Sequence, residues 1–318
     1  VASVAALAAF YASGGTVGAS SSNAAGLANA FGTASQLANM KTGTSPGASV
    51  AAGLSVPSAK VNTLADILNS CTATGGGTAC AALMAAATPP GGVAPHDTLD
   101  AIFNILRNPA ANIGALNALL PATPAFAPVV ASAVPDWTLA ATWSGGGMSD
   151  PTALALDSSG NAWVASYFSA LTEIPALGSG GPVQQIASAS TALLQSYGLT
   201  IDAGNNVWVS NEQSAGSVNS GFGSVAKFSS TGQLLSGASA YTAGGVYYPQ
   251  GLAADTTGNV WVVDYGNSML TLLASNGSAV NGSKAWGAGQ LSLPVAVAVD
   301  ANHNAWVANQ SSSTITRV

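Results

Sequence analysis

The amino-acid sequence predicts an α+β multidomain protein in which a small α-helical domain precedes an all-β domain made of repeats. Three observations lead to this prediction. Apolar residues recur at helical spacing in the first part of the chain, a Pro/Ala-rich segment follows, and the remainder repeats one pattern of Asp and Trp four times. We therefore expect a helical domain over residues 1–125, a semi-rigid linker over 126–135 and a repeat domain over 136–318.

The helical prediction depends on periodic apolar positions and on capping residues. Leu99, Ile102 and Leu106 lie on one helical face, and Asp97 stands where an N-cap is expected. Further helices are expected over about residues 23–40, over residues 61–68 and directly after Pro109.

Two cysteines, Cys71 and Cys80, flank a short segment with three consecutive glycines. Because glycine lets the chain turn back on itself, the two thiols can come within bonding range. We expect a disulfide, which indicates an oxidising compartment. A zinc site is not expected, since His96 and His303 are too distant from the cysteines and from each other to give ligand spacing.

Each repeat carries an Asp and a Trp six positions apart. The pairs are Asp157 and Trp163, Asp202 and Trp208, Asp255 and Trp261, and Asp300 and Trp306. The flanking residues alternate between apolar and polar, which is typical of a β-hairpin, with the Asp carboxylate holding the turn and the Trp as an apolar anchor. Successive Asp residues are 45, 53 and 45 positions apart, and more strand-like segments follow each hairpin. This is the spacing of four-stranded propeller blades.

The pattern Pro-x-x-Leu-Ala-x-Asp-x-x-Gly-Asn-x-Trp-Val resembles the NHL repeat of β-propellers, including the streptogramin (virginiamycin B) lyase-like group. The resemblance covers about residues 136–318 and implies an all-β propeller with four recognisable NHL-like blades. The helical part, through Asn62–Cys71 and Thr98–Pro109, resembles a segment that precedes such propellers in large secreted proteins of acidobacteria-like soil bacteria.

Four blades are fewer than NHL-type propellers usually have, and the last one stops after its third expected strand. Three arrangements follow: a small four-bladed ring, a ring completed by another chain, or part of a longer protein, which the start at Val1 favours. Residues 137–143 would supply a closing strand for a small ring. An unpaired strand predicts self-association through the incomplete last blade.

Residues suited to catalysis are scarce. In gluconolactonase-like propellers, an Asn or Asp five residues before the repeat Asp helps to hold a metal. The corresponding residues here are Thr152, Tyr197, Gln250 and Val295, none of them acidic. Streptogramin lyases rely on His and Glu, whereas the repeat part has only His303, Glu173 and Glu212. We expect no catalytic residue, metal or cofactor. The sequence leaves the question of enzymatic activity open and favours a protein without it.

Candidate ligand-facing residues lie three and four positions after each Trp, where the second strand of each repeat ends. They are Ser166 and Tyr167, Asn211 and Glu212, Asp264 and Tyr265, and Asn309 and Gln310. Strand ends that recur in register converge around the axis of a propeller, where these side chains would face a glycan or a protein. The alternative is that they form hydrogen bonds within each blade.

Charge composition limits the partners. Only 6% of the residues are charged and the net charge is −6, which excludes the basic surface that nucleic acid or an anionic membrane requires. No apolar run reaches the roughly 18 residues of a spanning helix. A neutral surface is typical of exported proteins, so we expect an extracellular or cell-surface location in a bacterium. The predicted function is a secreted or cell-surface binding or scaffold protein. The alternatives are a streptogramin lyase-like or lactonase-like enzyme and a structural subunit of an extracellular filament or surface assembly.

Overall fold

The computed structural model describes residues 1–7, 12–13, 16–73, 75–168, 170–177, 181–187, 192–213, 222–280, 286–287 and 289–318. The chain divides into two compact units. The helical unit comprises Val1–Ser144 with Ala176–Pro182, and the blade unit comprises Gly145–Pro175 with Val183–Val318. The boundary therefore lies after Ser144, later than the sequence predicts.

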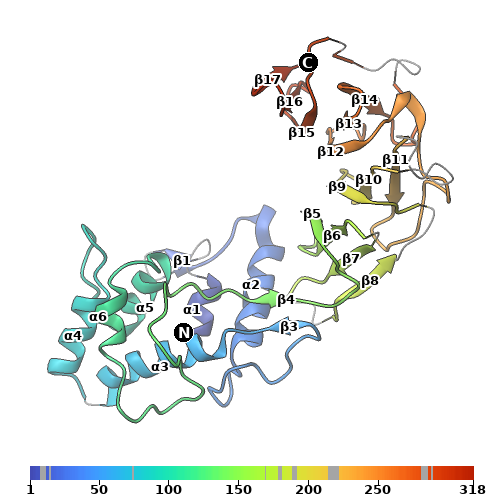
Figure 1. Cartoon of the computed structure of the whole chain (residues 1–318). Coiled ribbons are helices and arrows are strands. Elements are labelled where there is room, and N and C mark those ends of the chain that lie inside the picture. Colours follow the sequence, from blue (N-terminus) through green and yellow to red (C-terminus); the bar gives the residue numbers. More distant parts are fainter. Residues whose placement is uncertain are drawn as a thin grey trace. The chain divides into compact units, whose positions relative to one another are not determined.

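The helical unit is built from six helices in its described part (Figure 1). They are α1 (Ala2–Leu7), α2 (Ala24–Leu37), α3 (Ser58–Ala73), α4 (Thr78–Ala86), α5 (Thr98–Arg107) and α6 (Ile113–Asn117). Leu64, Ile67 and Leu83 form its buried centre with Ile102. Asp97 caps α5 by accepting a hydrogen bond from the Asp100 N–H at 2.8 Å. Helix α4 was not predicted, because its Ala-rich sequence lacks a contrast between two faces.

The Cys71–Cys80 disulfide joins the end of α3 to the start of α4. Two short strand pairs and one 3-10 turn complete the regular structure in the described part of this unit. The pairs are β1 (Ala12–Ser13) with β2 (Thr16–Val17) and β3 (Leu54–Ser55) with β4 (Thr142–Trp143), and the turn is η1 (Ser21–Asn23).

The segment predicted as a linker lies against α3. The Asp66 carboxylate accepts hydrogen bonds from the N–H groups of Ala125 and Phe126, at 2.8 and 3.1 Å. Lys60 forms an ion pair with Asp136 at 3.3 Å, and Trp137 is fully buried in the helical core. Residues 137–143 thus belong to the helical unit, and the expectation that they close a small ring is wrong for this structure, because Trp137 is buried in the helical core and Trp143 pairs with Leu54.

The described residues of the blade unit form four antiparallel sheets, which we call blades 1 to 4 (Figure 1). Blade 1 has β5 (Pro151–Leu156), β6 (Ala162–Ser166), β7 (Ala170–Ile174) and β8 (Gln184–Ala187). Blade 2 has β9 (Ser196–Ile201), β10 (Val207–Asn211) and β11 (Ser224–Phe228). Blade 3 has β12 (Pro249–Ala254), β13 (Val260–Asp264) and β14 (Met269–Leu273), with the 3-10 turn η2 (Ala243–Gly245) before it. Blade 4 has β15 (Pro294–Val299), β16 (Ala305–Asn309) and β17 (Thr314–Arg317).

Neighbouring blades meet through their first strands, with β5 beside β9, β9 beside β12 and β12 beside β15. Isolated bridges take the place of a fourth strand in blades 2 and 3, as between Phe228 and Leu234 and between Leu273 and Ala279. The four hairpins and the strands β11 and β14 therefore form as the alternating pattern predicts.

Each junction between blades is an apolar cluster of the same construction. The Trp of one blade packs with aliphatic residues on the facing side of the next blade. Trp163 packs with Leu199 and Val207, and Trp208 packs in the same way with Leu252 and Val260. The four sheets therefore stack through repeated Trp-to-aliphatic contacts, which explains why the Trp recurs in register.

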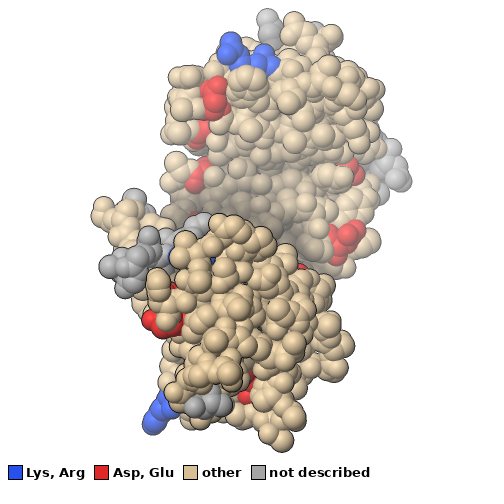
Figure 2. Space-filling view, turned by 90° about the vertical axis from the view of Figure 1, so that its left-hand side faces the viewer, with Lys and Arg blue, Asp and Glu red and all other residues tan. Residues whose placement is uncertain are grey.

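None of the helices in the described ranges has the length and apolar character needed to cross a bilayer. On the face of the molecule in Figure 2, charged side chains are few and are separated by wide uncharged areas.

Candidate functional site

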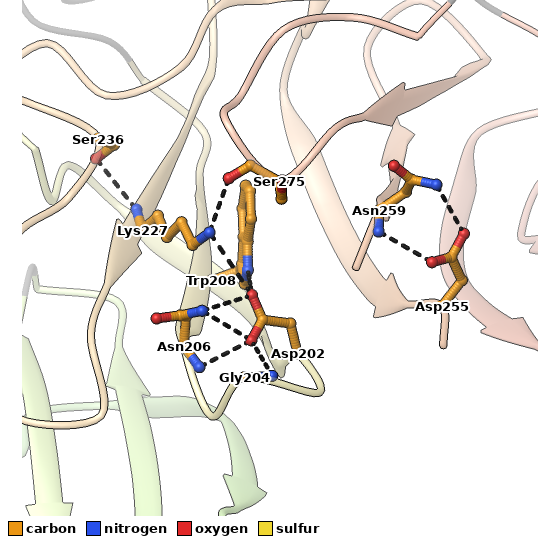
Figure 3. A network of polar contacts seen from close by, with 9 residues as sticks. All are labelled: Asp202, Gly204, Asn206, Trp208, Lys227, Ser236, Asp255, Asn259 and Ser275. Atoms are coloured by element: carbon orange, nitrogen blue, oxygen red, sulfur yellow. Dashed lines mark hydrogen bonds and ion pairs between the residues drawn. The ribbon is translucent and has the colours of Figure 1, made fainter. Parts of the chain in front are cut away.

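The repeat Asp holds the hairpin turn of its blade (Figure 3). One oxygen of Asp202 accepts the N–H groups of Gly204 and Asn206, each at 2.9 Å, and the other accepts the indole N–H of Trp208 at 2.9 Å. Blades 1 and 4 repeat the indole contact, at 3.2 Å for Trp163 and 3.0 Å for Trp306. These bonds tie turn and anchor together, so Asp and Trp have a structural role.

Blade 3 departs from this pattern. Asp255 accepts hydrogen bonds from the N–H groups of Thr257 and Asn259, at 2.8 and 2.9 Å. The indole N–H of Trp261 is buried and has no hydrogen-bond partner among the described residues. Its ring packs edge-on against Trp286 with the ring centres 5.9 Å apart.

Lys227 links blade 2 to blade 3. Its ammonium lies 4.6 Å from the centre of the Trp208 ring and 3.7 Å from the Asp202 carboxylate. It donates a hydrogen bond to the Ser275 carbonyl of blade 3 at 2.7 Å. Burial raises the pKa of Asp202, whereas the hydrogen bonds from Trp208 and Asn206 and the charge of Lys227 lower it. The lowering effects together exceed the effect of burial, so the pKa lies below its ordinary value. The carboxylate therefore stays ionised at neutral pH.

The residues three positions after each Trp are buried and bonded within their own blades. They are Ser166, Asn211, Asp264 and Asn309. Asn211 accepts the Leu194 N–H at 3.3 Å, Asp264 the Tyr247 N–H at 3.2 Å and Asn309 the Ser292 N–H at 3.1 Å. The Ser166 hydroxyl accepts the Ser149 N–H at 3.3 Å. Each side chain thus fixes the loop that precedes the first strand of its blade.

The residues four positions after each Trp are the accessible members of the predicted pairs. Tyr167, Glu212 and Tyr265 are partly exposed, and Gln310 is exposed. The backbone N–H of each donates to the residue just before the first strand of its blade. The acceptors are the carbonyls of Asp150, Gln195, Tyr248 and Leu293. All four acceptors are non-glycine residues with φ between 45° and 56°.

This left-handed conformation costs of the order of 1 kcal/mol or more per residue. Its recurrence in four blades shows that it belongs to the construction of the blade. This conformation turns the loop that leads into the first strand. As a result, the residue before the first strand lies beside the residue after the second strand, at one end of each blade. We call this end of the blade unit the strand-end face.

Aromatic side chains gather on the strand-end face where blades 2 and 3 meet. Phe222 packs edge-on against Tyr247, with ring centres 6.1 Å apart, and Tyr247 packs edge-on against Tyr248 at 5.3 Å. Phe222 is exposed and both tyrosines are partly exposed. A Cβ atom at Gly266 would lie 2.5 Å from the Tyr247 ring and 2.8 Å from the Tyr248 ring. Glycine at this position therefore makes room for the tyrosine pair.

A polar pair crosses the same junction. The Gln250 amide, at the start of β12, donates to the Glu212 carboxylate at 3.5 Å. Burial raises the pKa of Glu212, and the hydrogen bond from Gln250 partly offsets that rise. Gln250 is buried and Glu212 is partly exposed, so the junction presents one carboxylate and three aromatic rings at its surface, with the amide behind the carboxylate.

The ligand-facing residues predicted from sequence include Glu212 and Tyr265, but not Gln250, Phe222, Tyr247 or Tyr248. The three aromatic residues occupy loops outside the Asp–Trp register. The signal available in sequence was the Tyr-Tyr pair directly before Pro249, the residue that opens the first strand of blade 3.

Groups that could bind metal or act in catalysis are dispersed. Within the described ranges, no three His, Cys, Asp or Glu residues cluster closely enough to hold a metal ion. His303 lies in the turn of blade 4, where its φ is 63° and its N–H donates to the Asp300 carbonyl. His96 is exposed near the start of α5.

Comparison with known proteins identifies the repeat. Residues 246–270 match the NHL repeat family. No curated protein matches the chain in sequence. A streptogramin B lyase is similar in structure, with 14% identity over 54% of this chain and 52% of its own, and a TM-score of 0.42. Virginiamycin B lyase from Staphylococcus aureus shares 15% identity over 53% of this chain and 55% of its own, with a TM-score of 0.39.

A chain of a nidogen/laminin complex is 15% identical over 57% of this chain and 64% of its own, with a TM-score of 0.41. The match spans little more than half the length of either lyase. At these sequence identities and TM-scores, the similarity supports no inference about activity. The chain contains an NHL repeat in the third of four propeller-like blades, preceded by a helical unit.

Proposed function

We propose that the protein is an exported bacterial binding protein whose strand-end face takes a glycan at the junction of blades 2 and 3. The observation that carries the proposal is the group of Phe222, Tyr247 and Tyr248 beside Glu212 and Gln250. Aromatic rings offer flat apolar surface for the C–H faces of a sugar, and a carboxylate offers acceptors for its hydroxyl groups.

Two features support an exported location. The Cys71–Cys80 disulfide persists in oxidising compartments such as the bacterial periplasm or the cell exterior. The low charge content suits a protein that meets uncharged partners and not nucleic acid.

A glycan array, followed by calorimetric titration of the best ligand, tests the proposal. Tyr248→Ala removes a central ring and Glu212→Ala removes the partly exposed carboxylate, and each is expected to weaken binding by about tenfold. Phe31→Ala is the matched control, because Phe31 is an exposed aromatic residue of α2 in the helical unit. An array without any bound glycan, or equal losses in the variants and the control, would contradict the proposal.

The alternative is a lyase-like or lactonase-like propeller enzyme, and Glu212 is the group on this face whose raised pKa would suit a general base. The same purified protein can be assayed with streptogramin and lactone substrates. Binding without turnover supports the binding protein, whereas turnover that Glu212→Gln abolishes would replace the proposal with the enzyme.

A further inference from the structure

The Thr271 hydroxyl of β14 lies between two buried oxygen atoms. It is 2.6 Å from the Asp264 carboxyl group and 3.2 Å from the carbonyl of Gly244, in the loop that precedes blade 3. Asp264 and Thr271 are 0% and 1% exposed, and Gly244 is buried as well. Because a hydroxyl has one proton, Thr271 can donate to only one of these oxygens. Both contacts are hydrogen bonds at the same time only if Asp264 carries a proton and donates it to Thr271.

Two other blades show the direction in which this threonine donates. Blades 1 and 4 have a threonine at the same register position, opposite the residue that follows the Trp. In each, the hydroxyl donates to the loop before the first strand, from Thr172 to the Gly146 carbonyl at 2.6 Å and from Thr316 to the Gln290 carbonyl at 3.3 Å. The amide of Asn309, three positions after the Trp of blade 4, donates to the Thr316 hydroxyl at 2.9 Å. Amide, hydroxyl and carbonyl thus form a relay that begins with a donor, and a protonated carboxyl group in blade 3 is equivalent to that amide.

The loop that this relay holds leads directly to the aromatic group of the strand-end face. Gly244 lies three positions before Tyr247 and four before Tyr248. The other oxygen of Asp264 accepts the Tyr247 N–H at 3.2 Å. Asp264 therefore holds the loop at two points, directly at Tyr247 and through Thr271 at Gly244. Ionisation of Asp264 would draw the Thr271 proton to the carboxylate and deprive the buried Gly244 carbonyl of this donor, which is unfavourable.

We propose that Asp264 is a proton switch of the strand-end face, which holds the loop bearing Tyr247 and Tyr248 when protonated and releases that loop at Gly244 when ionised. Burial raises the pKa of Asp264 to about 7, so the proton is exchanged near neutral pH. The consequence for ligands rests on the proposed function: the face binds a glycan more tightly at acidic than at alkaline pH.

Few other titratable groups lie near Asp264. In the described part of the chain, β13 packs against β12, β14 and β15, and these three strands contain no charged or titratable residue. The loop before β12 contributes the phenols of Tyr247 and Tyr248, and Tyr265 follows Asp264 in the chain. Glu212 is the charged group of this junction, where it is bonded to an amide of β12. Burial also raises the pKa of Glu212, so the test has to separate the two carboxyl groups.

NMR of the isotope-labelled 318-residue chain, from about pH 5 to about pH 9, tests the switch without a ligand. The Cγ resonance of Asp264 is expected to titrate near pH 7. The amide resonance of Gly245, which shares a peptide group with the Gly244 carbonyl, should shift with the same midpoint. Asp264→Asn supplies a permanent donor, as in blade 4, and should hold the Gly245 resonance constant. Glu212→Gln is the matched control and should titrate like the wild type.

A second variant separates the relay from the mere presence of a charge. Thr271→Val removes the hydroxyl and keeps the shape of the side chain, so the Gly245 resonance should no longer follow the ionisation of Asp264. The Tyr247 N–H, which is bonded directly to the carboxyl group, should still follow it. An Asp264 that does not titrate in this range, or a Gly245 resonance that responds to pH equally in wild type and Asp264→Asn, would overturn the inference.

Binding is measured separately, with glucose and N-acetylglucosamine oligosaccharides as probes in calorimetric titrations. The protonated fraction of Asp264 falls from about nine-tenths at pH 6 to about one-tenth at pH 8, so the wild type should lose affinity severalfold, up to about tenfold. Asp264→Asn should bind equally at both pH values. A wild type that binds a probe equally at both would overturn the effect on binding. Absence of binding at either pH counts against the glycan function, while the NMR titration decides the switch by itself.

Discussion

Asp264 differs from the turn carboxylates, although it lies only nine positions from one of them. The repeat Asp residues accept many hydrogen bonds as ions, whereas burial raises the pKa of Asp264 to about 7 despite its bonds with Thr271 and the Tyr247 N–H. Blades 2 and 4 place Asn at the same position, where it makes comparable bonds. Asp264 therefore introduces a proton-binding site that the fold does not require.

Asp264→Asn is expected to change how stability depends on pH. The unfolded chain loses the Asp264 proton near the ordinary value of 3.8 and the folded chain loses it near 7, so the folded state holds more protons between these values. The free energy of unfolding of the wild type therefore falls as pH rises from about 4 to about 7. The variant should lack this decline in urea titrations. Parallel pH profiles for wild type and variant would show that Asp264 does not titrate in this range, and Asp150→Asn serves as an exposed control.

The repeat tryptophans differ in solvent exposure, so replacing them with Ala is expected to lower the free energy of unfolding by different amounts. Trp208→Ala removes a fully buried indole and is expected to lower the free energy of unfolding by about 3–5 kcal/mol. Trp306→Ala removes an indole that is 43% exposed and is expected to cost about 1 kcal/mol or less. Equal losses in denaturant titration would mean that the following blade does not bury the Trp.

At the scale of elements, the blades share one plan but differ at the position opposite the Trp. Lys227 in blade 2 lies over Trp208 and next to Asp202, whereas blade 1 has Glu173 opposite Trp163. Burial raises the pKa of Glu173, and the negative charge of Asp157 raises it further. Blade 1 therefore contains a repulsion where blade 2 contains an attraction.

Glu173→Gln is expected to raise the melting temperature at neutral pH. The folded-state pKa of Glu173 is raised, so its ionised form destabilises the folded state at high pH, and Gln mimics the protonated form. The gain should vanish below the ordinary pKa of 4.5, where Glu173 is protonated in both states. Calorimetric scans at about pH 7 and pH 3 distinguish this from a pH-independent packing effect, which would give the same shift at both.

The disulfide acts at the same scale by holding α3 to α4. Replacing both Cys71 and Cys80 with Ser is expected to lower the free energy of unfolding of the helical unit by about 2–3 kcal/mol, because the short loop is no longer closed in the unfolded chain. The blade unit, followed by the fluorescence of its tryptophans such as Trp163 and Trp208, should unfold as in the wild type. A thermal melt unaffected by the double substitution would contradict this account.

Sequence predicts some elements of this fold far better than others. The hairpins were predictable because an Asp and a Trp stand six positions apart in every blade, and in blades 1, 2 and 4 the two side chains bond to each other. The pairing of β4 with β3 was not, since Trp143 meets Leu54 from a distant part of the chain. In the candidate site, strand ends marked Glu212 and Tyr265. Local patterns cannot reveal that Asn211 and Asp264 turn inward, because that depends on which loop N–H groups need an acceptor.

At the scale of the whole molecule, the chain consists of two units that are stabilised in different ways. The helical unit has a disulfide and a single core, and the blade unit has a core divided among equivalent junctions. Because each junction uses the same register positions, the sites between blades are equivalent in backbone and differ in side chains. A ligand at one junction would therefore meet side chains that the other junctions do not share.

The most direct test of this account measures solvent access to individual tryptophans. In protein labelled with 5-fluorotryptophan, ¹⁹F resonances are assigned by single Trp→Phe substitutions, and their broadening by a soluble paramagnetic agent is measured. Trp163 and Trp208 should be protected, because the following blade covers them, whereas Trp306 should be accessible. A Trp208 as accessible as Trp306 would contradict the stacking of blades on which the whole account depends.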